Sequence, residues 1–259
     1  ILFMKFIILG CGSSMGVPRS DGYFGNCNPQ NIKNYRSRCS ALIKSKNETI
    51  LIDSSPDLRQ QLLKNNIKSI DKVLYSHMHA DQTHGINDLR VFYIKKKTPI
   101  PVFADLSTKK YLMKTFGYCF TNYSKEYPPT LKLNSIKQRL FIKNGKKKIP
   151  IKPIKVQHGK VRCICYIIDK KLAYISDVSN IKKSDYKYFM NLKYLVIDCL
   201  WFRNHPSHLN LENSLKLINI FKPKKAILTN LHSDLDYDFL KKKLPSNIIP
   251  AYDGLTLRL

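Results

Sequence analysis

The sequence predicts an α/β fold, an αββα sandwich in which two mixed β-sheets pack face to face and helices cover the outer faces. Three observations favour this class: short β-branched or apolar runs occur in both halves of the chain, segments with helical apolar spacing lie between them, and strands often follow one another directly instead of alternating regularly with helices. The 259 residues, of which 43% are hydrophobic, suffice for one large core, so we expect a single domain over residues 1–259.

Each predicted element follows from the spacing of its apolar residues, because side chains alternate between faces in a strand and recur every three or four positions in a helix. The segments with strand character are residues 6–9, 41–44, 49–52, 73–75, 101–104, 151–156, 163–168, 172–175, 194–197 and 226–228. The segments with helical spacing are residues 56–63, 107–116, 211–221 and 237–244. Residues 118–134, which include Tyr127-Pro128-Pro129, predict a surface loop or flap.

The chain carries a large excess of basic residues. Its 45 lysines and arginines against 18 acidic residues give a formal net charge of +27. Such a charge is typical of proteins that bind polyanions, because cations that neutralise phosphates release counterions. The lysines are spread along the whole chain, however, with short runs at 95–97, 146–148 and 241–243. Composition alone therefore leaves open both a solvated basic surface and a nucleic-acid-binding patch.

Cysteine usage and hydropathy predict a cytoplasmic protein. The seven cysteines are odd in number and include no CxxC pair, so we expect reduced thiols. Cys163 and Cys165 alternate within a predicted strand, which places both on one face and favours a role in core packing. No apolar stretch approaches the roughly 18–20 residues that a membrane span needs, so we expect no membrane partner.

The densest group of metal-ligand residues follows the predicted strand at 73–75. The segment His77-Met78-His79-Ala80-Asp81-Gln82-Thr83-His84 holds three of the seven histidines and one carboxylate. Divalent metals of borderline softness favour imidazole with carboxylate, and a short loop at a strand end presents such ligands together. The segment therefore predicts a metal site.

Other predicted strands also end on residues suited to metals. His158, Asp177, Asp198 and His232 each follow or close an apolar run. Loops at strand ends can converge at one edge of a sheet sandwich, where the strands give the site a rigid backing. Together with the first group, these residues supply enough histidine and aspartate for two metal ions.

In this order, the residues resemble the motifs of the metallo-β-lactamase fold hydrolases. The HxHxDH motif of that family is approximated by His77, His79, Asp81 and Gln82, and Asp53 resembles its early strand-end aspartate. The resemblance continues along nearly the whole chain and implies the fold predicted above.

Three further segments refine the resemblance. Residues 10–14, 85–90 and 204–208 look most like the phosphoribosyl cyclic phosphate phosphodiesterase group, and the tRNA 3′-end processing endonuclease is a more distant relative. The resemblance implies two divalent metal ions, with zinc as the first expectation and manganese as the alternative. Asp81 and His208 are the candidate catalytic residues, with His208 as general acid or phosphate-binding group and His205 as the second candidate. The implied ligands are His77, His79 and His158 for one ion, Asp81, Gln82 and His232 for the other, and Asp177 as the bridge between them.

The chemistry of such a centre is hydrolysis. Two divalent ions about 3.5–4 Å apart lower the pKa of a shared water toward neutrality, which leaves hydroxide as the nucleophile, and they offset charge on a phosphoryl oxygen. The leaving alkoxide of a phosphodiester also needs a proton, which a nearby histidine that binds no metal can supply.

Several positions depart from the family pattern. Gln82 stands where the motif has histidine, and a neutral amide oxygen is a weaker ligand, so the second site should bind zinc less tightly or prefer manganese, and operation with one metal stays open. His84 is either a substitute ligand or a packing residue. Cys27 is the only cysteine of segment 26–29, which therefore cannot supply the four ligands of a structural zinc. Arg36 and Arg38 are candidates for gripping a phosphate at the site's mouth or for surface ion pairs.

The leading functional hypothesis is a metal-dependent phosphodiesterase that acts on a small, cyclic or linear, phosphate ester. The alternatives are a nuclease that uses the same site, which the charge of +27 favours, and a metal-binding protein without catalysis, which Gln82 favours. A nucleic-acid partner and a homodimer are both compatible with the sequence.

Overall fold

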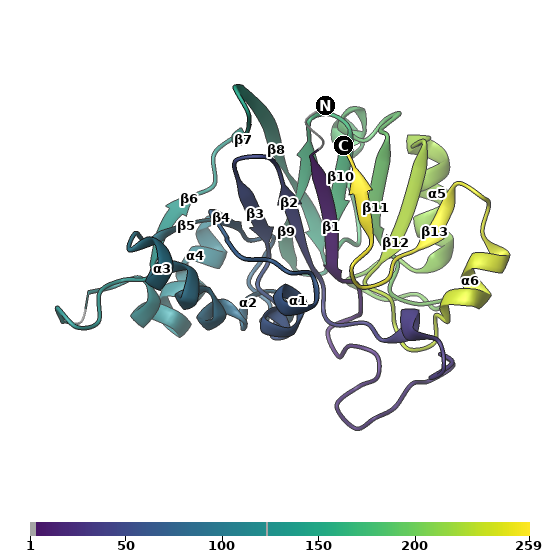
Figure 1. The fold of residues 1–259 in the computed structure, drawn as a ribbon. Coiled ribbons are helices and arrows are strands. Elements are labelled where there is room, and N and C mark those ends of the chain that lie inside the picture. The colour runs from purple at the N-terminus through teal and green to yellow at the C-terminus, as the bar shows by residue number, and fades with distance from the viewer. Residues whose placement is uncertain (1–3, 123) are drawn as a thin grey trace.

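The computed structural model describes residues 4–122 and 124–259, and within them two seven-stranded sheets lie face to face (Figure 1). The first sheet has the strand order β14-β1-β2-β3-β4-β5-β6 and mixes antiparallel with parallel pairs. Its strands are β1 (Lys5–Gly10), β2 (Ser40–Lys44), β3 (Thr49–Ile52), β4 (Lys72–Leu74), β5 (Ile100–Ala104), β6 (Leu131–Ser135) and β14 (Thr256–Arg258).

The second sheet has the order β13-β12-β11-β10-β9-β8-β7 and is also mixed. The long antiparallel pair β8–β9 sets Ile151 opposite Ile168 and His158 opposite Val161. Its strands are β7 (Leu140–Asn144), β8 (Lys147–His158), β9 (Val161–Ile168), β10 (Leu172–Ile175), β11 (Tyr194–Asp198), β12 (Lys225–Thr229) and β13 (Ile248–Pro250).

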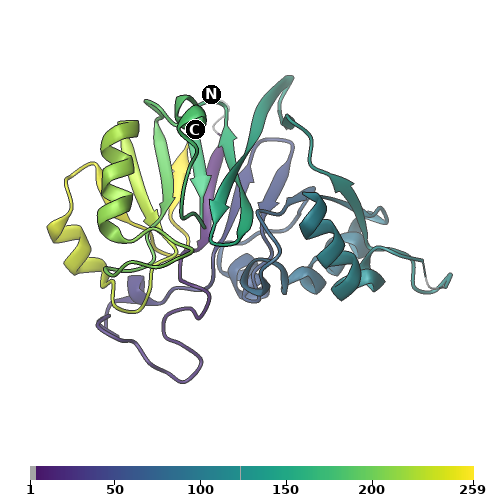
Figure 2. The same ribbon diagram turned by 180° about the vertical axis from the view of Figure 1, so that it is seen from behind.

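The helices cover the outer faces of the two sheets (Figures 1 and 2), which confirms the predicted αββα sandwich. Four helices lie on the side of the first sheet: α1 (Leu58–Lys64), α2 (Ala80–Thr83), α3 (Arg90–Lys96) and α4 (Leu106–Phe116). On the side of the second sheet lie α5 (Leu211–Phe221) and α6 (Tyr237–Lys243). Among the described residues, no helix combines the length and the apolar character needed to cross a membrane.

The hydrophobic core has three layers because each sheet buries both of its faces. Between the sheets, Phe6 of β1 meets Tyr174 of β10 with ring centroids 5.4 Å apart. Outside the first sheet, Leu58 and Phe92 belong to the layer beneath the helices, and outside the second sheet Phe221 of α5 does the same. Burial on both faces explains why most strands are continuous apolar runs.

All ten predicted strands and all four predicted helices are present, with ends that move by a few residues. The sequence did not indicate β6, β7, β13 and β14, which lie at or next to sheet edges. β13 and β14 have three residues each, which is a short signal, and β7 alternates buried with exposed positions. Helices α2, which has four residues, and α3 were also not predicted.

The seven cysteines are buried and free, as predicted. Cys163 and Cys165 belong to the same core layer, between the second sheet and its helices. Their packing role is therefore confirmed.

The strand topology brings several chain segments to one edge of the sandwich. β3, β4 and β5 are parallel to one another, and so are β10, β11 and β12, so the carboxyl ends within each set share an edge. In Figure 1 this is the lower edge, where the long segment between β1 and β2 also lies. The candidate site residues follow these strand ends.

We predict that Gly85→Ala destabilises the fold at this edge. A Cβ at position 85 would lie 2.0 Å from the carbonyl oxygen of Ser55 and 2.9 Å from Cβ of Leu58, so the loop after β3 and helix α1 would have to move. We expect the free energy of unfolding, measured by urea titration, to fall by about 3 kcal/mol or more. Gly22→Ala is the control, because nothing lies within 4 Å of its Cβ and only its positive φ of 82° adds strain. Equal losses in both variants would contradict the packing argument.

Candidate metal centre

The loop after β4 is held in place by the loop after β3. The buried Asp53 carboxylate accepts a hydrogen bond from the backbone N–H of Ser76 at 2.7 Å. The backbone N–H of Ser54 donates to the carbonyl of Gln82 at 2.8 Å, and that of Gly85 donates to the carbonyl of Ser54 at 2.9 Å. These contacts fix both ends of the segment 76–85, which carries the first group of predicted ligands.

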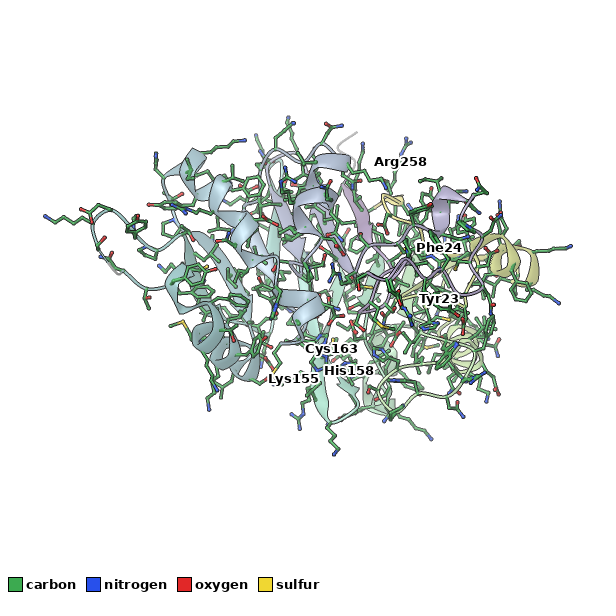
Figure 3. All side chains as sticks on the ribbon, turned by 90° about the horizontal axis from the view of Figure 1, so that it is seen from below. Tyr23, Phe24, Lys155, His158, Cys163 and Arg258 are labelled. Atoms are coloured by element: carbon green, nitrogen blue, oxygen red, sulfur yellow. The ribbon has the colours of Figure 1, made fainter. Side chains whose placement is uncertain are left out.

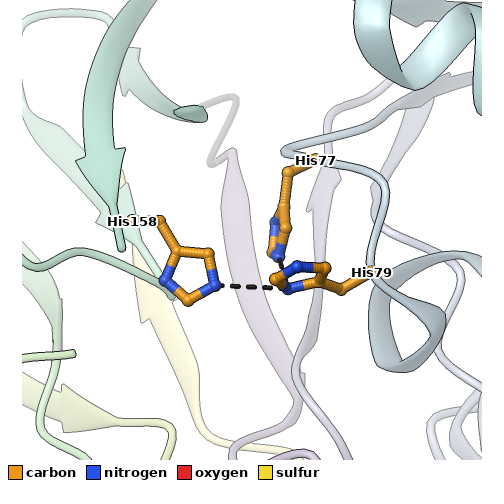
Figure 4. A group of neighbouring side chains, drawn as sticks. All are labelled: His77, His79 and His158. Carbon is orange, nitrogen blue, oxygen red and sulfur yellow. Dashed lines mark hydrogen bonds between the residues drawn. The ribbon is translucent and has the colours of Figure 1, made fainter. Parts of the chain in front are cut away.

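Three imidazoles from two sheets converge at this edge (Figure 4). Nδ1 of His79 lies 2.9 Å from Nε2 of His77 and 3.2 Å from Nε2 of His158. His77 and His79 follow β4 of the first sheet, whereas His158 closes β8 of the second sheet. The view from below shows His158 at this edge, with Lys155 and Cys163 nearby on the same pair of strands (Figure 3). The sandwich therefore assembles ligands that are 79 residues apart.

The outer ring nitrogens are held by neighbours, and this orients the inner nitrogens. Nδ1 of His158 donates to the carbonyl oxygen of Ser207 at 2.8 Å, which leaves the Nε2 lone pair facing the group. Nδ1 of His77 lies 3.0 Å from the hydroxyl of Ser76. Burial lowers the pKa of His77 to about 3 and also lowers the pKa of His79, so both rings are neutral at physiological pH. Neutral rings with converging lone pairs fit a bound metal ion.

A second group extends the centre. His158, Asp177 and His208 each offer a ligand atom within 4.8 Å of the others. Asp177 follows β10 and is buried, and Asp81 lies close enough to interact with it electrostatically. Burial and the charge of Asp177 raise the pKa of Asp81 to about 6. A cation bound between Asp81 and Asp177 would offset the repulsion between the two carboxylates.

Gln82 bridges the two carboxylates in an unexpected way. Its Nε2 donates to Oδ2 of Asp81 at 3.1 Å and to Oδ2 of Asp177 at 3.3 Å, while its buried Oε1 has no partner among the described residues. The amide N–H groups therefore offset part of the negative charge between Asp81 and Asp177, as a bound cation would. If the amide turns over, its oxygen faces the same side and becomes a metal ligand. The residues thus fit a first ion directly, and a second ion after a side-chain turn.

His208 is held by a buried carboxylate. Its Nδ1 lies 2.8 Å from Oδ2 of Asp198, and Asn230 donates to Oδ1 of Asp198 at 3.1 Å. Burial alone would lower the pKa of His208, but the charge and hydrogen bond of Asp198 raise it to about 9. His208 is therefore protonated at neutral pH, and its ring centroid lies 4.6 Å from that of His158.

The remaining predicted residues lie elsewhere. The ring of His232 packs against Trp201, with centroids 4.9 Å apart, and its Nδ1 accepts from the backbone N–H of Asp234, so it belongs to neither converging group. Its role as a ligand stays a prediction. Nε2 of His84 lies 2.8 Å from the hydroxyl of Tyr111, which supports the packing alternative.

The two arginines have different roles. Arg36 is buried and donates to the carbonyl of Leu235 at 2.7 Å, so it ties two loops together and does not reach the surface. This corrects the expectation that it grips a phosphate or forms a surface ion pair, because its guanidinium is used internally. Arg38 binds the carboxylate of Asp57 in a bidentate ion pair, with one N–O distance of 2.6 Å.

Sequence reasoning gave no role to several residues of the centre. Asp198 was grouped with the strand-end residues suited to metals, whereas in the structure it belongs to neither converging group and its Oδ2 lies 2.8 Å from Nδ1 of His208. Asn230 and the carbonyl of Ser207 carried no signal, because their contacts depend on the tertiary fold.

The chain matches one family profile and is similar to several solved structures. The profile described as "Beta-lactamase superfamily domain" matches residues 48–230. A solved structure described as a new diphosphatase from the PhnP family shares 28% sequence identity with this chain. The match covers 100% of this chain and 98% of the diphosphatase chain, with a TM-score of 0.88. Zinc-bound PqqB from Methylobacterium extorquens is 15% identical, with coverage of 98% and 100% and a TM-score of 0.75, and shares the fold.

Two curated relatives match by sequence. An octanoyltransferase from Porphyromonas gingivalis is 30% identical over 256 residues, which are 97% of this chain and 51% of that protein. Ribonuclease Z from Methanosarcina mazei is 26% identical over 126 residues, which are 46% of this chain and 36% of that enzyme. The chain thus spans about half the length of the first relative.

We predict that Gln82→His increases metal binding. An imidazole at position 82 removes the amide donor between Asp81 and Asp177 and adds a stronger ligand. Zinc per chain, measured by plasma mass spectrometry after dialysis against a weak chelator, should rise by up to one further equivalent. Gln138→His, which adds a histidine at an exposed position, should leave it unchanged. The interpretation of Gln82 is wrong if both variants bind as much zinc as the parent.

Proposed function

The chain belongs to the metallo-β-lactamase fold hydrolases related to the PhnP family, and we propose that it hydrolyses a phosphodiester or diphosphate bond in a small phosphate ester. The observation that carries this proposal is the position of His208. A protonated imidazole, backed by a buried carboxylate, adjoins a group of ligands suited to a divalent metal. That combination places a proton donor beside an electrophilic centre, as the hydrolysis of a phosphate ester requires.

The metal site and the side chains around it would perform different parts of the reaction. Bound divalent ions would activate water and offset the negative charge of a phosphoryl group. His77, His79 and His158 would hold the first ion, and Asp177, which converges with His158, would lie beside it. Asp81 would contribute to a second ion, for which zinc is our first expectation and manganese the alternative.

His208 would donate a proton to the leaving oxygen of the ester. Its Nδ1 is engaged by Asp198, so Nε2 is the nitrogen that is left to act on the substrate. Asp198 touches no substrate atom in this scheme. It is a positioning residue that keeps the ring oriented and charged, with Asn230 holding its other oxygen.

A cavity of about 730 Å³ offers room for the part of the ester that does not react. It is lined by both cations and acids, and two of the cations are paired: Arg19 with Asp21 and Arg38 with Asp57. Lys64 and Asp253 add to the charged lining, and Met15 and Val17 add apolar surface. None of the metal-centre residues lines this cavity; its link to the centre is Arg38, whose pKa is raised first by its hydrogen bond with Asp57 and last by the charge of Asp81. A small ester with a polar group suits such a mixed lining.

The competing function is RNA cleavage at the same centre. The net charge of +27 and the similarity to Ribonuclease Z favour it. In the view of Figure 3, long side chains that end in nitrogen project around the whole outline, so the basic charge is dispersed. A dispersed charge gives less support to a dedicated RNA surface than a gathered patch would.

The test of the proposed function is turnover of bis(p-nitrophenyl) phosphate by metal-stripped protein reloaded with zinc or manganese. We expect turnover that requires the metal and exceeds the cleavage of single-stranded RNA under the same conditions. Faster RNA cleavage with a steep dependence on salt would favour the nuclease. Metal binding without turnover of either substrate would contradict both and favour a non-catalytic role.

We predict that His208→Ala lowers kcat by about 10²–10⁴-fold, the usual contribution of a general acid, while the metal content stays near that of the parent. His84→Ala is the matched control, because that histidine contacts Tyr111 outside the centre and should change kcat little. A large loss of metal from the His208 variant would instead make it a ligand.

Asp198→Asn should lower kcat without raising KM. The amide keeps the shape of the carboxylate but removes the charge that holds His208 protonated. A purely structural role would show as a parallel loss of folded protein and metal, and circular dichroism together with metal analysis would detect it.

A further inference from the structure

A second cavity, of about 590 Å³, lies on the outer face of the second sheet, away from the metal centre. Its floor is apolar and is formed in part by Ile167 and Leu192, which are 4% and 3% exposed. β8 contributes Lys152, which pairs with Ile167 across the antiparallel ladder and so shares its face. Lys152 and His158 are six positions apart on β8, which corresponds to about 20 Å along an extended strand.

The rim of this cavity is basic. Arg139, Lys152, Lys170 and Lys187 line it, and no acidic residue does. Within residues 4–122 and 124–259, none of the four side chains forms an ion pair. Arg139 immediately precedes β7, so the antiparallel register, extended by one residue, sets it opposite Lys152.

The nearby acids do not neutralise this rim. Asp169 binds Lys171 at 2.6 Å, and Asp185 lies on the short 3₁₀ helix Lys183–Tyr188 without lining the cavity. Four like charges around one concave surface repel one another, and an anionic ligand would offset that repulsion.

An aromatic ring completes the lining. Nζ of Lys152 lies 3.7 Å from the ring centroid of Tyr188, and Nζ of Lys187 lies 5.3 Å from it. The hydrogen-bonding and charge of Lys152, followed by the charge of Lys187, lower the pKa of the half-buried Tyr188 phenol, as expected in a positive potential. Met190, 39% exposed, adds a polarisable apolar side chain.

We propose that this cavity, which we call the outer basic pocket (Arg139, Lys152, Lys170, Lys187, Tyr188 and Met190), binds a nucleotide, with phosphate on the basic rim and the base over the apolar floor beside the tyrosine. The basic rim, the apolar floor and the aromatic ring together favour a ligand that has both a phosphate and a planar apolar group. Inorganic phosphate would leave the apolar floor unused, and a fatty acid has a single charge for four cations. A nucleotide offers both a charged phosphate and a planar apolar group, and so does the end of a single RNA strand.

This site is separate from the proposed hydrolysis. The outer basic pocket contains none of the residues assigned to the metal centre, and Lys152 and His158 are separated by about half the length of β8. Binding there and turnover at the metal centre can therefore be measured independently.

The experiment is isothermal titration of the intact chain with AMP, a phosphate monoester, compared with adenosine and with inorganic phosphate. We expect AMP to bind more tightly than either, and binding to weaken with salt. The double variant Lys152→Gln, Lys187→Gln should raise the Kd for AMP by about tenfold or more, because it removes charge-assisted hydrogen bonds. Its turnover of bis(p-nitrophenyl) phosphate should match that of the parent.

The matched control is Lys241→Gln, Lys242→Gln, which removes the same charge from exposed positions on α6. It should leave the Kd for AMP unchanged. Equal weakening in both double variants would mean that binding follows net charge, and an unchanged Kd in the pocket variant would place AMP elsewhere; either result overturns the proposal. Phosphate or adenosine binding as tightly as AMP would also overturn it. A short oligouridylate, titrated in parallel, distinguishes a strand from a free nucleotide by which of the two binds more tightly.

Discussion

Nδ1 of His79 lies 2.9 Å from Nε2 of His77 and 3.2 Å from Nε2 of His158, and the rest of the centre depends on this convergence of three ring nitrogens. A single proton can link two of these atoms at most, whereas one divalent cation satisfies all three. Burial keeps the rings neutral, as the lowered pKa of His77 and His79 indicates. The buried acid Asp177 then brings negative charge to the same place. A metal ion is the partner that relieves both the crowding of lone pairs and the cost of the buried carboxylate.

The two sheets hold the three imidazoles in this arrangement because each sheet is a rigid, separate support. Asp53 and Ser54 fix the loop after β4 through backbone hydrogen bonds, and Ser207 orients His158 from the opposite sheet. The ring of His208 is held in a similar way by Asp198, the last residue of β11. His158 and His208 thus each have a partner that sets the orientation of the ring. Ligand geometry of this kind is preorganised by the fold and needs little adjustment when a metal binds.

The sequence predicted the sandwich and the main elements because burial on both faces makes continuous apolar runs, which are the clearest local signal for a strand. It also predicted that His77, His79, His158 and Asp177 belong together, because each follows a strand that ends at a common edge. It did not reveal the orientation of Gln82, whose amide lies between two acids, since that depends on residues 95 positions away. The partners of His232 were hidden for the same reason. Trp201 and Asp234 meet it only in the folded chain.

The most direct test of the metal centre is X-ray absorption at the zinc edge of the zinc-loaded chain. The geometry predicts a first shell of nitrogen and oxygen at about 2.0–2.1 Å, with the multiple-scattering pattern of several imidazoles. That pattern should weaken in His158→Ala, which removes the ligand that the second sheet contributes. A shell dominated by sulfur at about 2.3 Å, or a spectrum without imidazole scattering, would contradict the account.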